Sequence, residues 1–131
     1  MSPVAALRTA SNHGEDEPIW HMLHIWCPGC NSLHAVNLVG PNGFRPNVCW
    51  DWDGNLEAPT ISPSILCYDS VFLHEDGTQC ADWSTDYQTE LHTQGRCHSF
   101  VRAGRWEFLS DCAHTLAGQT VDMVPLPDGW V

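Results

Sequence analysis

The chain has 131 residues, of which 43% are hydrophobic and seven are Trp, and 16 acidic residues outnumber five basic ones to give a formal net charge of −11. This length and apolar content suit one domain whose core is built around a few large rings. The negative charge argues against a protein that binds nucleic acid through its phosphates, because such a protein needs a basic surface. No apolar run approaches the roughly 18 residues of a membrane-spanning segment, so we expect no membrane partner either.

The start of the chain and its cysteines indicate the compartment. Residues 1–17 are small and polar, then acidic, and predict a loose leader ahead of a single domain over residues 18–131. The segment MSPVAALRTA is too short and too polar at its flanks for the apolar region of a secretory signal, so we expect a cytoplasmic protein. Seven cysteines, an odd number, then indicate metal ligands and free thiols instead of a disulfide framework.

Most of the chain predicts short strands. Residues 19–26 alternate large side chains on both faces, and residues 33–39 predict the strand that returns after a tight turn. Residues 58–65 contain two prolines and cannot be a central strand throughout, and 79–95 predicts a polar excursion. The further predicted strands are 47–53, ended by a hairpin-type turn at 53–55, then 66–78, 96–102, 105–110 and one short strand within 120–131.

A hairpin and a short helix are predicted towards the end of the chain. Ala103-Gly104 suits a two-residue turn between the strands 96–102 and 105–110. Asp111 can cap a short helix, and Gly118 can end it. We therefore predict a mainly β, small α+β fold, with antiparallel hairpins around a zinc knuckle and one short helix near 111–119.

The spacing Cys27-Pro28-Gly29-Cys30 predicts half of a zinc site, because two thiols at this spacing converge on one point. The predicted hairpin supplies a third ligand. Successive side chains of a strand point to opposite faces, so Cys97 and His98 cannot easily serve the same centre. We assign Cys97 to the zinc with Cys27 and Cys30, which leaves His98 available for another role.

The fourth zinc ligand has three candidates. His114 can fold back towards Cys97, His34 follows the knuckle on the returning strand, and His24 precedes the knuckle by three residues. A thiolate-rich site of this kind, with no open coordination position, is typical of structural zinc. The remaining cysteines, Cys49, Cys67, Cys80 and Cys112, are interpreted as small buried hydrophobic residues.

His98 with a nearby carboxylate would be the base half of a nucleophilic site, and the predicted hairpin places Asp111 diagonally from it. The candidate nucleophiles are Ser62 and Ser64, in a segment whose path is restricted by two prolines. From the residues alone we prefer the interpretation of this segment as a capped turn whose hydroxyls satisfy backbone groups.

The motifs WCPGC, W-x-W-x-G-N, PTISPSI, CHSFVRAG and DCAHTLAG occur in this order. In this combination, over roughly residues 20–125, the chain resembles a family of small zinc-knuckle proteins of phages and prophages that often carry an ammonia monooxygenase label. That label conflicts with the sequence, because a membrane copper oxidase needs transmembrane spans.

The chain is also distantly similar to peptidases of bacterial operons that encode a ubiquitin-like protein and its activating and conjugating enzymes. Pro63-Ser64-Ile65 matches one of their motifs, and His98 matches the histidine of another. The resemblance implies Ser64 as nucleophile, His98 as general base and Asp111, or else Asp53, as the acid that orients the imidazole. Cys97 stands where those relatives carry Ser, and their knuckle has more cysteines, which bears on the zinc ligand set.

With the predicted zinc site, the resemblance implies a serine-type peptidase, stabilised by structural zinc, that processes or deconjugates a ubiquitin-like protein. By analogy, a phage-borne member would act as counter-defence in the host cytoplasm. One alternative is a non-catalytic zinc-binding interaction module, a phage inhibitor or virion accessory protein, with Trp50 and Trp52 at its interface. Another is a zinc hydrolase in which His98 and His114 hold a catalytic metal with an open position.

Overall fold

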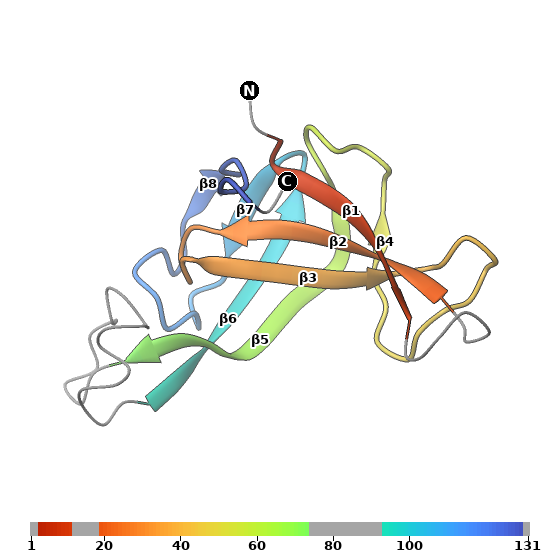
Figure 1. The fold of residues 1–131 in the computed structure, drawn as a ribbon. Coiled ribbons are helices and arrows are strands. Elements are labelled where there is room, and N and C mark those ends of the chain that lie inside the picture. The colour runs from red at the N-terminus through yellow and green to blue at the C-terminus, as the bar shows by residue number, and fades with distance from the viewer. Residues whose placement is uncertain (1–2, 12–18, 74–92, 130–131) are drawn as a thin grey trace.

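Two antiparallel sheets make up the part of the chain that the computed structural model describes, residues 3–11, 19–73 and 93–129 (Figure 1). The first sheet has the strand order β1-β2-β3 and the second has the order β4-β5-β6-β7-β8. The strands are β1 (Ala5–Ser11), β2 (Ile19–Cys27), β3 (Ser32–Leu38), β4 (Asp51–Trp52), β5 (Ile61–Leu73), β6 (Thr93–Arg102), β7 (Arg105–Phe108) and β8 (Thr120–Asp122).

The first sheet follows from the alternation in its central strand. Leu23, Ile25 and Cys27 of β2 are completely buried, while the side chains between them are half-buried. On β3 the residues opposite them alternate in the same way, with Val36 beside Leu23 and His34 beside Ile25. One face of this sheet therefore points into the core, and it carries Cys27 and His34 there.

The second sheet is built around the long pairing of β5 with β6. Its ladder is interrupted between Ile61 and Ile65, where Pro63 lies inside β5. Proline has no backbone N–H to donate to a neighbouring strand, so the irregularity falls where the sequence predicts it. The turn from β6 to β7 is the two-residue Ala103-Gly104 turn, in which both residues have positive φ. This confirms the predicted hairpin over residues 99–108.

The core lies between the two sheets. It joins Leu23, Ile25 and Val36 of the first sheet to Ile61, Ile65, Val101 and Trp106 of the second in one buried cluster. The ring of His34 contacts Trp106 across this interface, with 5.9 Å between the ring centroids. The buried cluster therefore holds the two sheets together by burial of apolar side chains from both.

The predicted α+β class is wrong, because no helix occurs among the described residues and the two sheets pack face to face instead of surrounding a zinc knuckle. Residues 111–119 form successive turns. A helix capped by Asp111 would need the backbone N–H of Ala117 to bond to the carbonyl of Ala113, but it bonds to that of His114 at 3.3 Å, while the N–H of Ala113 bonds to Arg96 of β6 at 2.8 Å. Pairing with a neighbouring strand therefore replaces the helical pattern.

Two other segments differ from the sequence-based expectations. Ala5–Ser11, within the predicted leader, pair with β2 as β1, and Ala5 and Ala6 are buried. The predicted hairpin turn at 53–55 is part of a longer connection, in which Asp53 and Asn55 accept backbone N–H bonds. The rest of the leader after residue 11, and the predicted excursion up to residue 92, lie outside the described residues. Within the described ranges there is no helix that could cross a membrane.

Candidate catalytic and metal-binding site

A hydrogen-bonded chain of three side chains lies on the outer face of the second sheet. Nε2 of His98 lies 3.1 Å from Oγ of Ser64, and Nδ1 of the same ring lies 3.3 Å from Oδ2 of Asp111. Ser64 and His98 are half-buried and Asp111 is exposed, so the serine hydroxyl is not sealed in the core. The structure thus brings together the three residues for which the family resemblance implied catalytic roles.

The pairing of β5 with β6 places Ser64 near His98. His98 lies directly opposite Leu66, and Ser64 precedes Leu66 by two residues on the same face of β5. The indole N–H of Trp50 donates to the carbonyl oxygen of Ser64 at 3.1 Å. This bond fixes the backbone of Ser64 on the side of β5 that faces away from β6. The alternative interpretation of the sequence placed Trp50 at a protein interface instead.

Cys112 connects Asp111 to His98. Its Sγ accepts the backbone N–H of His98 at 3.2 Å and donates to the carbonyl oxygen of His98 at 3.0 Å. Together with the bond from Ala113 N to the Arg96 carbonyl, this fixes the turn that follows β7 against β6. Sequence interpretation missed this role, because a lone cysteine in a polar turn has no spacing pattern that reveals it.

The charges around Asp111 favour its ionised form. Its Oδ2 lies 3.3 Å both from Nδ1 of His98 and from the Arg96 guanidinium. Desolvation raises the pKa of Asp111, but the hydrogen bond and charge of His98, with the charge of Arg96, outweigh it and lower the pKa overall. A carboxylate that stays ionised can orient the imidazole and compensate its positive charge after proton uptake.

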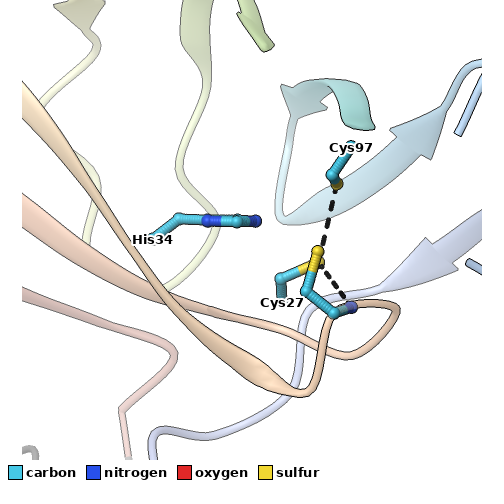
Figure 2. A group of neighbouring side chains, drawn as sticks. Cys27, His34 and Cys97 are labelled. Carbon is cyan, nitrogen blue, oxygen red and sulfur yellow. Dashed lines mark hydrogen bonds between the residues drawn. The ribbon is translucent and has the colours of Figure 1, made fainter. Parts of the chain in front are cut away.

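A second group of side chains lies on the inner face, between the sheets (Figure 2). Cys27, Cys30, His34 and Cys97 are all buried, and one ligand atom from each lies within 4.8 Å of all the others. The first three come from β2, β3 and the turn between them, and Cys97 comes from β6. In Figure 2 the His34 ring points towards the two labelled cysteines. This arrangement would join the two sheets through a metal ion.

The donor set fits zinc. The sulfurs of Cys27 and Cys97 are 3.9 Å apart, close to the edge of about 3.8 Å that tetrahedral zinc with Zn–S bonds of about 2.3 Å requires. The side chains of Cys30 and Cys97 lower the pKa of Cys27, whereas the neighbouring Cys27 and Cys30 raise that of Cys97. These clustered thiols cannot all ionise in a buried site without a cation, which a divalent metal supplies.

The two histidines near this cluster differ in the contacts of their ring nitrogens. Nδ1 of His34 contacts Sγ of Cys67 at 3.6 Å, and its buried Nε2 has no hydrogen-bond partner in the described part of the chain. Burial lowers the pKa of His34, but the sulfurs of Cys27, Cys30 and Cys67 outweigh it and raise the pKa to about 12. A metal cation among these sulfurs would take the place of the ring proton, and it would give the orphaned nitrogen the partner it lacks.

His114 is arranged differently. Its Nδ1 accepts the backbone N–H of Leu116 at 3.2 Å, and its Nε2 lies 3.3 Å from Sγ of Cys97. Burial lowers the pKa of His114, which favours the neutral ring, and with Nδ1 as the acceptor the ring proton lies on Nε2. That nitrogen can donate to the Cys97 sulfur but has no lone pair for a metal. This geometry favours His34 over His114 as the fourth ligand.

The remaining candidates are also placed. His24 lies between the buried Leu23 and Ile25 on the opposite face of β2, away from Cys27.

Cys97, Cys112 and His114 form a second close group, and neither this group nor the first includes His98. Cys97 is buried in the core, whereas the His98 ring contacts the exposed Asp111, so the two side chains point to opposite faces of β6, as the predicted alternation requires. Cys67 lies opposite Cys97 on β5 and contacts His34. Its place beside the first metal-ligating group was not predicted from the sequence, because its pairing partner is distant in the chain. Cys80 lies outside the described residues.

Substituting the two histidines separately tests the choice of ligand. We expect His34→Ala to lower zinc affinity more than 100-fold, because it removes a direct ligand. His114→Ala should cost only about 10- to 100-fold, as the loss of a hydrogen bond to a ligand does. Absorption spectra of the Co²⁺-substituted protein separate the two cases, since only His34→Ala should change the ligand field. A changed spectrum for His114→Ala and an unchanged one for His34→Ala would reverse the assignment.

Comparison with known proteins identifies one family. Residues 5–109 match the family model described as bacterial ubiquitination-like system serine protease (BubE). The matched range includes Ser64, His98 and all four members of the first metal-ligating group, and it ends just before Asp111. No curated protein and no solved structure matches the chain significantly.

Proposed function

Because this chain belongs to the family of bacterial ubiquitination-like system serine proteases, we propose that Ser64, His98 and Asp111 are its catalytic triad. The observation that carries the proposal is the continuous chain of contacts from Ser64 Oγ through both nitrogens of His98 to Asp111, at 3.1 and 3.3 Å. A serine hydroxyl becomes a nucleophile when a base within hydrogen-bond reach takes its proton. Both nitrogens of His98 are engaged in this chain, so the residue has no free position for a metal.

The geometry supports acyl transfer in two steps. Oγ of Ser64 attacks the carbonyl carbon of the substrate while its proton moves to Nε2 of His98. The Asp111 carboxylate accepts the Nδ1–H bond and stabilises the imidazolium that forms. His98 then gives the proton to the leaving amine, and an acyl-enzyme ester remains on Ser64. Water, deprotonated by His98, attacks this ester, and the proton returns to Ser64 as the acid product leaves.

We propose that the substrate is a protein, namely a ubiquitin-like protein that is cleaved at its tail or removed from a conjugate. The site supports a chain-like substrate, because the half-buried nucleophile lies on the outer face of a strand beside an exposed side chain. In a phage the same activity would be counter-defence, since it would remove conjugates that a host pathway makes.

In this proposal the metal site has a structural role. Cys27, Cys30, His34 and Cys97 would hold Zn²⁺, which would neutralise the thiolates and connect the two sheets. Cys97 is bonded directly to His98 along β6. The residues of the metal site therefore fix the backbone that carries the catalytic base, while the proton transfers take place on the other face.

Labelling with a fluorophosphonate tests the proposed function. We expect a covalent adduct on Ser64, found by peptide mass spectrometry, because an activated serine displaces fluoride from the reagent. His98→Ala should slow this labelling by at least 100-fold, since the hydroxyl loses its base. An adduct on another serine, or none on the folded protein, would rule out Ser64 as the nucleophile.

Comparing two aspartates tests the acid of the triad. We expect Asp111→Asn to lower kcat/KM for peptide cleavage by about 10²- to 10⁴-fold, because an amide no longer stabilises the imidazolium. Asp53→Asn is the control: Asp53 accepts backbone N–H bonds from Asn55 and Thr60, and an amide oxygen can still accept them. Equal activity of the two variants would remove Asp111 from the triad.

A further inference from the structure

Two exposed apolar side chains lie in line with the proposed nucleophile. Leu66 is 38% exposed and Tyr68 is 67% exposed, whereas Ile65 between Ser64 and Leu66 is only 3% exposed. Leu66 lies opposite His98, and Ser64 contacts the same imidazole, so both project from the outer face of β5. Tyr68 follows at the point where the register of the β5–β6 pairing shifts, and it is the most exposed of these side chains. Large apolar groups at such exposure are unusual when they follow one another along a single face.

The neighbouring strand continues this surface. His98 lies opposite Leu66, so the first of the two apolar side chains stands beside the proposed base. Two residues further along β6 lies Phe100, whose ring is half-buried and carries the Arg102 guanidinium at 4.2 Å from its centroid. The outer face of β5 and β6 therefore combines the reactive pair with Leu, Tyr, Phe and Arg, the kinds of side chain that often anchor protein partners.

We propose that Leu66 and Tyr68 are specificity-determining residues that bind alternate apolar side chains of an extended segment of the protein substrate. This inference rests on the proposed function, because it takes Ser64 as the position of the cleaved bond. Two residues of a strand span about 6.6 Å, and an extended substrate segment has the same repeat. A substrate that acylates Ser64 and runs along β5 therefore places one of its side chains against Leu66. The substrate side chain two residues further along then lies against Tyr68.

Cleavage of a synthetic library of unstructured random peptides, with products sequenced by mass spectrometry, tests this inference. We expect the wild-type protein to prefer apolar residues at alternate positions on one side of the cleaved bond. Tyr68→Ala should reduce at least tenfold the preference for an apolar residue at the substrate position farther from the cleaved bond. Leu66→Asp should reduce the preference at the nearer position by a similar factor. Fluorophosphonate labelling of Ser64 should keep its wild-type rate in Tyr68→Ala, because this substitution adds no charge beside His98 and removes neither the base nor the nucleophile.

Leu56 offers a matched control. It is 41% exposed, close to the value for Leu66, but it lies in the connection between β4 and β5. Leu56→Asp should therefore leave the peptide preferences unchanged. If Ser64 is labelled, three results would overturn the inference while the proposed function stands. The library would not be cleaved, the cleaved peptides would show no alternate apolar preference, or that preference would survive Tyr68→Ala. Failure of Ser64 to label at all would refute the proposed function and this inference with it.

Discussion

Ser64→Ala is expected to lower kcat/KM for cleavage of a peptide bond by at least about 10³-fold. The substitution removes the only atom that His98 Nε2 contacts at 3.1 Å in the proposed relay, so no acyl-enzyme can form. It removes one half-buried hydroxyl without leaving a large cavity. The thermal unfolding midpoint and the zinc content should therefore stay close to those of the wild-type protein, and both should be measured with the activity.

Ser62→Ala is the matched control for this prediction. Ser62 lies two residues earlier on β5, is exposed, and was the other candidate nucleophile in the same proline-containing segment. Its substitution should leave kcat/KM within a few-fold of the wild-type value. If Ser64→Ala retained activity and Ser62→Ala lost it, the nucleophile would be Ser62, and the contact between Ser64 and His98 would be only structural.

Cys97→Ser is expected to abolish stable zinc binding and to unfold much of the domain at ambient temperature. Structural zinc contributes about 10–16 kcal/mol in small zinc-binding peptides, whereas the net stability of a domain is about 5–15 kcal/mol. Cys97 is also the only member of the first metal-ligating group that comes from the second sheet. Its loss would therefore break the connection through the metal between two parts of the chain 70 residues apart.

Cys49→Ser controls for the loss of a thiol as such. Cys49 is half-buried, contacts the carbonyl oxygen of Trp50 at 3.7 Å and belongs to neither metal-ligating group. This variant should bind zinc and melt like the wild-type protein. Metal content by mass spectrometry and thermal melting by circular dichroism give the comparison. A Cys97→Ser protein that still binds one zinc ion and melts within a few degrees of wild type would contradict the proposed ligand set.

Several parts of the site were predictable because they depend on short-range chemistry. A Cys-Pro-Gly-Cys turn brings its own two thiols together, and an Ala-Gly pair between alternating segments predicts a hairpin. Once that hairpin is assumed, the pleat alone requires Cys97 and His98 to face opposite ways. The structure follows these local rules at each of the three places.

The predicted helix over 111–119 failed for the opposite reason. An aspartate before a short segment and a glycine near its end are helix signals, but they are weak in a segment of this length. Ala113 instead bonds to Arg96 of β6, and the Cys112 sulfur bonds to the backbone of His98. These partners belong to another strand, so the local pattern contains no information about them.

By itself the sequence determined the two cysteines of the turn, the β6–β7 hairpin and the opposite orientation of Cys97 and His98 on β6, because alternation and turn chemistry act over a few residues. Only the tertiary structure decided that Ser64 meets His98 from 34 residues away, and that the nitrogen of His34 is the one left without a partner. Both outcomes depend on which strands pair and in which register, and on which backbone groups reach each ring. Those contacts exist only after the two sheets have come together.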